Sequence, residues 1–288
     1  MSTKSSNSSD TLLAANRAES WLTAERAESW RRGKRLRGEV FGPATEMMLD
    51  LANMRVGDRV LEVAAGTGDL AIMIARRVGP NGYVLATDVS TSMLNVAAEA
   101  VLNAGLTNVE TRVMDAENIE LDADSFDAVI CRMGLMLFSK PVKTLIGMHR
   151  VLKPAARVFA LVWSTEEKNP YRGVPLAIVR RIGNNLTEEP GLRLFALGKP
   201  GVLEETFRAA GFLDAAIYTV PTQWRFPSTA EAVRFMKDSY PGLQHLMTQL
   251  SETERELAWT EIEQQLSQFE GPDGFEAPGE VLMGVGTK

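Results

Sequence analysis

The segment that decides the fold reads Leu61-Glu62-Val63-Ala64-Ala65-Gly66-Thr67-Gly68-Asp69-Leu70. Its apolar beginning predicts a strand that ends near Val63, and the apolar spacing across 70–78 predicts a helix. The glycines between them predict a tight turn, in which a ligand can approach the backbone and the free N–H groups of the helix. Strand, turn and helix together predict a ligand site at the edge of an α/β sheet.

Outward from this segment, strands and helices alternate along the chain. Further strands are expected at 83–87, 109–114, 126–131, 158–163, 215–220 and 281–285. This alternation predicts an α/β protein with a Rossmann-like, doubly wound, seven-stranded and mainly parallel sheet.

The remaining segments are interpreted as additions to that core. Two capping boxes, at 228–231 and 251–254, predict helices in a section that interrupts the alternation. The apolar stripe of this section is interpreted as core packing, with a lid as the alternative. The expected organisation is a disordered tail at 1–10, an N-terminal helical cap at 11–50, the core at 51–221, a helical lid insertion at 222–275, and the last strand at 276–288.

Composition excludes several classes of function. The 288 residues carry a net charge of -6, which gives no global attraction to nucleic acid. No apolar run reaches the roughly 20 residues that a membrane span needs. Cys131 is the one cysteine, so no intrachain disulfide can form, which suits a cytoplasmic protein. No Cys/His cluster suggests a metal. The expected partner is a small-molecule substrate, and a homodimer is an open alternative to a monomer.

Charge beside the turn distinguishes between two cofactors. The glycine spacing also fits a dinucleotide site, and Asp88 follows Gly68 by 20 residues at the end of the next strand, where it can hold a ribose. Glu62 and Asp69, however, would place negative charge beside a pyrophosphate. S-adenosylmethionine has no phosphate and carries an ammonium and a sulfonium, which acidic groups attract. The alternative interpretation makes Glu62 an exposed strand end.

A third carboxylate follows the next strand, in Met114-Asp115-Ala116-Glu117. An acidic side chain there can accept a hydrogen bond from the amino group of an adenine. Three carboxylates at three successive strand ends, with glycines between the first two, form a more specific pattern than any one motif.

These motifs resemble those of class I S-adenosylmethionine-dependent methyltransferases. The segments 131–138 and 148–154 resemble the subgroup of ubiquinone/menaquinone-biosynthesis methyltransferases. The resemblance implies that the last strand is antiparallel and that the turn and strand ends bind the cofactor. The expected cofactor-binding residues are Glu62, Ala64, Gly66, Thr67, Gly68, Asp88, Val89, Ser90, Met93, Asp115, Ala116, Arg132 and Met133.

The sequence departs from the family pattern at three places. Ala64 stands at the first glycine of the turn, a variation that should not block cofactor binding. Ser139-Lys140 and Ala155-Ala156 replace an acidic turn and a glycine pair, which weakens any transfer of a substrate assignment.

Aromatic residues gather where a substrate cavity is expected. Together they predict a largely apolar pocket for a planar phenol, a quinone precursor or a natural-product scaffold. The expected substrate residues are Trp30, Phe41, Phe138, Trp163, Tyr171 and Trp224.

Basic and titratable residues give weaker indications. The basic run at 31–37 is interpreted as a solvated helix face, with recognition of an acidic substrate as the alternative. His149 is interpreted as structural, and Cys131 as inert packing. His245 is a weak candidate for a general base, although methyl transfer need not use one, because alignment of the reacting atoms supplies much of the acceleration.

The predicted function is transfer of the methyl group of S-adenosylmethionine to an O, C or N atom of a small aromatic or apolar molecule. Two alternatives stay open at this point. One is an NAD(P)-dependent oxidoreductase, and the other is a protein of this fold that binds the cofactor without methylating.

Overall fold

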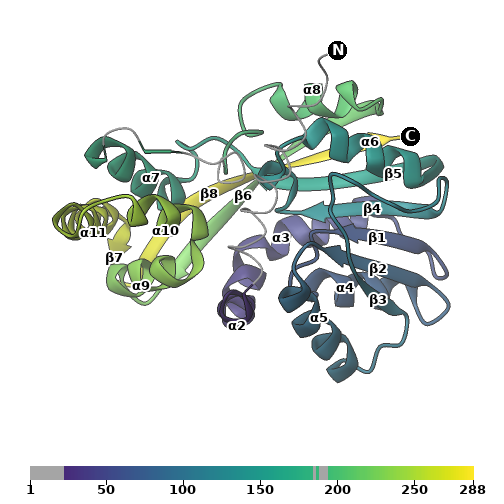
Figure 1. Ribbon diagram of the computed structural model, residues 1–288, viewed down its shortest axis with the longest axis horizontal. Coiled ribbons are helices and arrows are strands. Elements are labelled where there is room, and N and C mark those ends of the chain that lie inside the picture. The colour runs from purple at the N-terminus through teal and green to yellow at the C-terminus, as the bar shows by residue number, and fades with distance from the viewer. Residues whose placement is uncertain (1–22, 184–185, 188–193) are drawn as a thin grey trace, which may run out of the picture.

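One sheet runs through the protein. This computed structural model describes residues 23–183, 186–187 and 194–288, so the predicted tail at 1–10 and part of the predicted cap lie outside the described residues (Figure 1). The strand order is β3-β2-β1-β4-β5-β8-β6, and a short β7 pairs with β8. The predicted Rossmann-like sheet with an antiparallel last strand is confirmed.

The first five strands are parallel. They are β1 (Arg59–Val63), β2 (Tyr83–Asp88), β3 (Val109–Val113), β4 (Phe126–Arg132) and β5 (Leu152–Trp163). Strand β8 (Gly274–Thr287) is antiparallel to both β5 and β6 (Leu213–Phe226), and β7 (Glu270–Gly271) closes a small hairpin. Most side chains of β1 and β4 are buried, because helices cover both faces of a parallel sheet.

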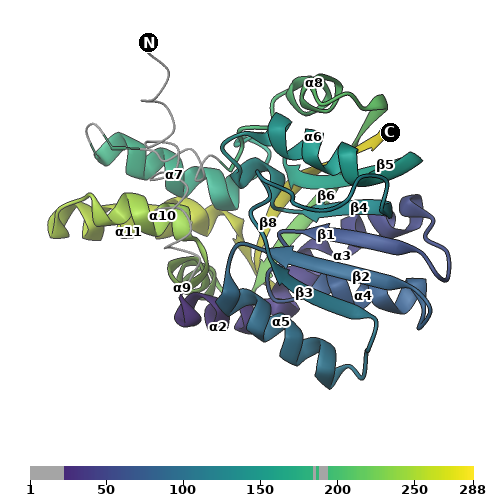
Figure 2. The same cartoon turned by 45° about the vertical axis from the view of Figure 1, so that its right-hand side comes forward.

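Helices flank the sheet on both sides (Figure 2). One face carries α3 (Lys34–Ala52), α4 (Asp69–Val78) and α5 (Thr91–Asn103), and the other carries α6 (Pro141–Val151) and α8 (Val202–Ala209). Helix α4 forms as the sequence predicts, because Leu70, Ile74 and Val78 recur at helical spacing and are fully buried. A single 3-10 turn, η1 (Leu135–Leu137), follows β4.

The last two long strands extend beyond the sheet. Strands β6 and β8 have 14 residues each, and their pairing continues to Trp224 with Ala277 and Phe226 with Phe275. The predicted helical insertion at 222–275 therefore begins and ends as strand. The reason is visible in the sequence, because the buried Trp224 stands between the polar Gln223 and Arg225, an alternation of period two.

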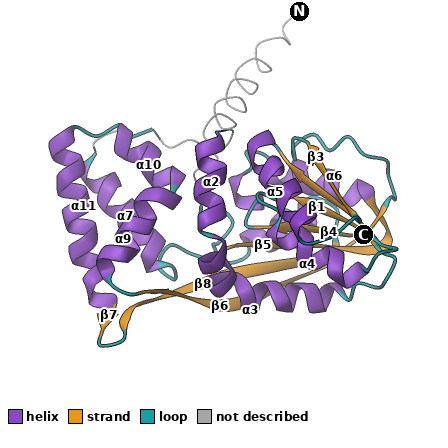
Figure 3. Cartoon of the chain, turned by 90° about the horizontal axis from the view of Figure 1, so that it is seen from below, coloured by secondary structure: helices purple, strands orange, loops and turns teal. Residues whose placement is uncertain are grey.

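Four helices gather around the far end of this two-stranded extension (Figure 3). They are α7 (Pro170–Ile182), α9 (Thr229–Ser239), α10 (Pro241–Thr248) and α11 (Glu252–Leu266), which the short η3 (Ser267–Phe269) follows. We call these four helices the helical lobe. The predicted capping box at Ser251 and Glu254 is present, with both reciprocal hydrogen bonds. None of the described helices is long and apolar enough to cross a membrane.

Helix α2 (Ala24–Arg32) lies between the helical lobe and α5 (Figure 3). The Arg26 guanidinium donates to the Asp238 carbonyl at 3.2 Å and to Gln244 Oε1 at 2.7 Å, and Ser29 Oγ donates to the same Asp238 carbonyl at 3.0 Å. These bonds attach α2 to α9 and α10, so α2 spans the space between the lobe and the sheet.

Candidate active site

A cavity of about 280 Å³ opens at the carboxyl edge of the parallel strands. Its walls come from the ends of β1, β2 and β4, from the segment after β3, from α2, and from the helical lobe. The strand order reverses between β1 and β4, and ligands of doubly wound sheets bind at such a switch point. The fold thus places the deciding turn of the sequence on the wall of the cavity.

The turn between β1 and α4 has a left-handed backbone at alternate positions. The φ angles are +59° at Ala64, +56° at Gly66 and +78° at Gly68. A side chain on Gly66 would lie 3.5 Å from Trp30 Nε1, so Trp30 of α2 covers the turn directly. The absence of a Cβ at Gly66 leaves the backbone exposed to the cavity, as a cofactor cradle requires.

Glu62 is the penultimate residue of β1 and lines the cavity. The residue is only 2% exposed, and its Oε2 has no hydrogen-bond partner among the described residues. Burial raises the pKa of Glu62 to about 8, against the opposing field of Arg132. A cationic ligand would satisfy this oxygen and favour its ionised form. The alternative interpretation of Glu62 as an exposed strand end is wrong.

Asp88 supports the glycine turn from the end of β2. Its Oδ2 accepts the Gly66 N–H and its Oδ1 accepts the Ser90 N–H, both at 2.9 Å. Burial raises the pKa of Asp88, and these backbone N–H groups oppose the rise. Each carboxylate oxygen has further acceptor capacity, so Asp88 can hold the turn and still accept from ribose hydroxyls.

The carboxylates after β3 organise the next loop. Asp115 Oδ1 accepts the Glu117 N–H at 2.9 Å, and Glu117 Oε1 accepts the Ser139 N–H at 2.7 Å. Glu117 therefore fixes the loop that carries Phe138 on the cavity wall, a role that the sequence analysis did not assign.

Most of the predicted cofactor residues meet at this cavity. Those that line it are Glu62, Ala64, Gly66, Asp88, Val89, Met93, Asp115, Ala116, Arg132 and Met133. Thr67, Gly68 and Ser90 do not line it, because they are buried in the turn and its flanking helices. A Cβ on Gly68 would lie 2.8 Å from the Ala97 Cβ, so Gly68 permits close packing of α4 on α5. Ser90 caps α5 by accepting the Met93 N–H at 3.2 Å.

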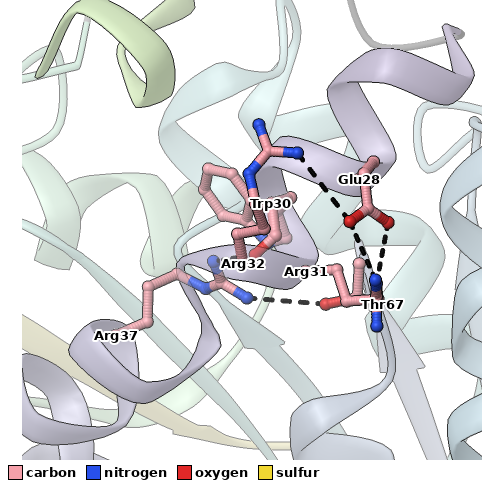
Figure 4. A network of polar contacts seen from close by, with 6 residues as sticks. All are labelled: Glu28, Trp30, Arg31, Arg32, Arg37 and Thr67. Carbon is pink, nitrogen blue, oxygen red and sulfur yellow. Dashed lines mark hydrogen bonds and ion pairs between the residues drawn. The ribbon is translucent and has the colours of Figure 1, made fainter. Parts of the chain in front are cut away.

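The predicted negative charge of Asp69 is compensated within the protein. Asp69 pairs with Arg37 at 3.0 Å and with Lys34 at 3.2 Å, and it does not line the cavity. Arg37 also lies 4.4 Å from the centre of the Trp30 ring, and it donates to the Trp30 carbonyl and to Thr67 Oγ1 (Figure 4). The acidic lining therefore rests on Glu62, Asp88 and Asp115 rather than on Asp69.

The rest of the basic run behaves as a solvated face. Arg31 and Arg32 both pair with Glu28 (Figure 4). Arg35 pairs with Glu39. Arg37 departs from that prediction, because it is 8% exposed and lines the cavity.

Five of the six predicted aromatic residues line the cavity, from α2, α3, β5, β6 and the segment after η1. Phe41 lies 5.3 Å from Trp163 and 6.3 Å from Trp224 between ring centres, and Trp30 and Phe138 also line the cavity. Tyr171 does not line it. Its hydroxyl donates to the Ala232 carbonyl at 2.7 Å, and its fully buried ring packs 4.7 Å from Trp224. Tyr171 thus joins α7 to α9, and its assignment to the substrate wall is corrected.

Neither histidine lines the cavity. His149 packs 5.0 Å from the Phe212 ring, as its structural interpretation predicts. His245 lies on α10, so the structure gives the weak base candidate no position beside the reacting groups.

Burial raises the pKa of Cys131 to about 12, which fits inert packing. In the described part of the chain, no cluster of His, Cys, Asp or Glu could hold a metal ion.

The sequence analysis missed the contribution of α7. No helix was predicted directly after β5, although Asn169-Pro170 is a helix-start pattern. The helix brings Arg172 into the cavity, where the guanidinium lies 4.8 Å from the Trp224 ring centre and 4.6 Å from that of Tyr240. Ser239 and Tyr240, at the junction of α9 and α10, complete this side.

The strand order and the glycine turn define a Rossmann-like fold, which solved structures of other proteins share. The YcgJ protein of Bacillus subtilis has this fold with a TM-score of 0.57 and 19% identity, over 86% of this chain and 98% of that one. Phosphoethanolamine N-methyltransferase 2 of Haemonchus contortus, solved with S-adenosyl-L-methionine, has a TM-score of 0.55 and 18% identity, over 85% of this chain and 52% of that one. These likenesses show the fold.

Comparison of sequences shows similarity to one methyltransferase family. Residues 44–179 match the model of the ubiE/COQ5 methyltransferase family. A ubiquinone/menaquinone biosynthesis C-methyltransferase UbiE of Pseudomonas putida is 38% identical over 117 residues, which are 40% of this chain and 46% of that protein. The chain spans about half the length of the curated relatives it matches. The predicted resemblance to this subgroup is confirmed.

Proposed function

We propose that this protein transfers the methyl group of S-adenosylmethionine to an O, C or N atom of a small aromatic or apolar molecule. The observation that carries the proposal is the buried Glu62 carboxylate, with an unpartnered oxygen, beside the bare backbone of Gly66 in one cavity. A cytoplasmic location and a homodimer stay predictions.

The residues on the sheet side fit the cofactor. Glu62 would receive the ammonium of its amino-acid portion, since an unpaired buried carboxylate is costly without a cation. Asp88 would accept from the ribose hydroxyls, and Asp115 would accept from the adenine amine. Arg37 and Lys34 pair with Asp69, so Glu62 and Asp88 are the acidic groups that a ligand meets at the turn.

When bound, the cofactor supplies an activated methyl group on a sulfonium. The chain then has to hold the acceptor atom in line with that group and keep water away. The aromatic wall of Phe41, Trp163 and Trp224 can bind a flat apolar molecule against the sheet edge, and Trp30 of α2 covers the turn. The acidic groups at the strand ends and the aromatic wall beside them support methyl transfer to a small molecule.

An NAD(P)-dependent oxidoreductase is the competing function. Glu62 opposes it, because a pyrophosphate would bring negative charge, and no cation, to a buried carboxyl oxygen that has no hydrogen-bond partner among the described residues. A protein of this fold that binds the cofactor without methylating would have the same cavity on the sheet side.

Two measurements test the proposal. Calorimetry should show binding of S-adenosylmethionine and S-adenosylhomocysteine, and formation of S-adenosylhomocysteine should be followed with a panel of phenols, quinone precursors and aromatic acids. Gly66→Val should abolish cofactor binding and product formation, because it adds a side chain under Trp30 at a φ of +56°. Affinity for NAD(P) without affinity for S-adenosylmethionine would contradict the proposal, and binding without turnover on any acceptor would favour the non-methylating alternative.

A further inference from the structure

Three arginines line the cavity, and they differ in their surroundings. Arg37 pairs with Asp69 at 3.0 Å, and Arg132 acts on the nearby Glu62 carboxylate, whose pKa it lowers. Arg172 has no such neighbour. Across residues 23–183, 186–187 and 194–288, its guanidinium forms no ion pair and no hydrogen bond, although the residue is only 9% exposed.

Aromatic rings surround this buried cation. The guanidinium carbon lies 4.6 Å from the ring centre of Tyr240, 4.8 Å from that of Trp224 and 5.4 Å from that of Tyr171. Cation–π contacts hold the guanidinium in place, but they leave its N–H donors without acceptors. Burial lowers the pKa of Arg172, as expected for a charge in an apolar site.

A second donor lines the same side of the cavity. Ser239, at the end of α9, is 9% exposed, and its hydroxyl has no hydrogen-bond partner among the described residues. Two polar groups that can donate, without an acceptor for either, indicate a position for a ligand that brings oxygen atoms and negative charge.

The backbone that carries Arg172 is held firmly. Asn169, the cap of α7, donates from Nδ2 to the Glu280 carbonyl at 3.0 Å and accepts the Glu280 N–H on Oδ1 at 2.9 Å. This pair of bonds attaches the first turn of α7 to β8. The Tyr171 hydroxyl, one residue before Arg172, is bonded to α9. Arg172 is therefore positioned before any ligand arrives, which lowers the entropic cost of binding.

The charged groups of the cavity differ in how they are compensated. At the strand ends, Glu62, Asp88 and Asp115 lie near Arg37 and Arg132, whereas on the lobe side Arg172 forms no ion pair within the described residues. Resting on the methyl-transfer function proposed above, we infer that the methyl acceptor is an aromatic molecule with an anionic oxygen group, a carboxylate or an ionised hydroxyl, which binds Arg172 and Ser239. The rings of Trp224 and Tyr240 then flank its flat portion.

The experiment compares anionic ligands with neutral molecules of the same shape. 1-Naphthoate against 1-naphthamide tests a carboxylate, and 4-nitrophenolate against 4-nitroanisole tests an ionised hydroxyl. Each is titrated by calorimetry into the full chain, with and without saturating S-adenosylhomocysteine. We expect at least one anion to bind about tenfold more tightly than its neutral counterpart, as a charge-assisted hydrogen bond would give.

Variants assign that preference to the proposed site. Arg172→Met keeps the length and the apolar contacts of the side chain, and it should remove the preference for the anion. Arg172→Lys should retain part of this preference, and Ser239→Ala should reduce it. Arg180→Met, on the outer part of the same helix where Arg180 pairs with Glu166, should leave it unchanged. Thermal unfolding and S-adenosylhomocysteine affinity verify that each variant folds. If Arg172→Met does not fold, Arg172→Lys and Ser239→Ala still test the site.

The outcomes separate this inference from the proposed function. If neither anion exceeds its neutral counterpart in the wild type, or if the preference survives in Arg172→Met, the anion site is wrong even when S-adenosylhomocysteine binds normally. If S-adenosylhomocysteine does not bind, the methyl-transfer function is wrong, and the titrations without it still decide whether Arg172 binds anions.

Discussion

At the scale of single residues, the site depends on charges that the protein leaves uncompensated. Glu62 and Asp69 are close in sequence, yet Asp69 is neutralised by Arg37 and Lys34, whereas Glu62 keeps an unpartnered oxygen. The free energy of a buried, unpaired carboxylate is unfavourable, so Glu62 should lower the stability of the ligand-free protein and strengthen the binding of a cation.

The first prediction concerns the pH dependence of cofactor binding. The pKa of Glu62 is about 8 in the folded protein, against an ordinary value of 4.5, so a proton must leave before a cation binds. The affinity for S-adenosylmethionine should therefore rise between pH 6 and 8 by up to about tenfold per pH unit and level off above pH 8. Calorimetry in buffers of different ionisation enthalpy should detect proton release, and Glu62→Gln should abolish it.

The same residue has the opposite effect on stability. Between pH 4.5 and 8 the folded protein retains a proton on Glu62 that the unfolded chain has lost, so this contribution to stability falls as pH rises through that window. Glu62→Gln should consequently raise Tm at pH 8 more than at pH 5, while it weakens cofactor binding. An equal change in Tm at both pH values would contradict the shifted pKa.

The second prediction concerns Asp88. Its carboxylate accepts the Gly66 N–H of the glycine turn and the Ser90 N–H before α5, and it would also hold the ribose. Asp88→Ala should therefore lower stability by about 1–3 kcal/mol as well as cofactor affinity, because both N–H groups lose their acceptor. Asp88→Asn is the matched control, since its one amide oxygen can replace only one of the two acceptors. Unchanged S-adenosylhomocysteine affinity in a folded Asp88→Ala protein would exclude the ribose role.

At the scale of elements, the glycine turn serves packing as well as binding. Gly66 faces the cavity under Trp30, whereas Gly68 faces Ala97 of α5, where the ideal Cβ would be 2.8 Å from the Ala97 Cβ and 3.0 Å from its Cα. One motif thus divides into a position for the ligand and a position for helix packing. The division arises because Gly66 lies on the cavity side of the turn, whereas Gly68 lies on the side that packs against α5.

The third prediction separates these roles. Gly68→Ala should lower stability by about 2–4 kcal/mol, since it adds a clash to an unfavourable φ of +78°. Gly105→Ala is the control, because its φ is +69° but nothing lies within 4 Å of the added Cβ. Urea unfolding should show a larger loss of the free energy of unfolding for Gly68→Ala than for Gly105→Ala. Adding Ala97→Gly to Gly68→Ala should recover part of that free energy. Equal losses at both glycines would mean that backbone strain alone is responsible.

At the scale of the whole molecule, the cavity lies between the sheet and the helical lobe, and α2 spans both. Trp30 on α2 covers the glycine turn, Arg26 and Ser29 bind the lobe, and Arg37 just beyond α2 is paired with Asp69. Deletion of the N-terminal segment through residue 38 would remove the buried Arg37 as well, so smaller changes test the cover more directly.

The fourth prediction is that α2 is a mobile cover. Amides of 24–32 should exchange quickly in the free protein and become protected when S-adenosylhomocysteine and substrate bind, because Trp30 lies against the turn. Arg26→Ala should speed this exchange and reduce turnover with little effect on Tm. Arg31→Ala, on the same helix but paired with Glu28 of its own helix at the surface, should change neither the exchange nor the turnover. Exchange that is slow without ligand and unchanged by it would show that α2 is a fixed part of the wall.

The sequence by itself determined the sheet and the sheet side of the site. Helical and strand periodicities are local, and a glycine turn after a buried strand has one main use at a sheet edge, so Glu62, Gly66, Asp88 and Asp115 could be found from their positions at strand ends. The register of parallel strands then brings their carboxyl ends together without further information.

Only the tertiary structure decided which of these groups stay unpaired and what lies opposite them. The charge of Asp69 is compensated by Arg37, 32 positions away, and Arg172 reaches the cavity from a helix whose first turn is fixed by β8. Tyr171 and Arg172 are adjacent in the chain, yet one joins two helices and the other faces the cavity. Such differences arise from long-range pairing and burial, which one-dimensional patterns of residue type do not encode.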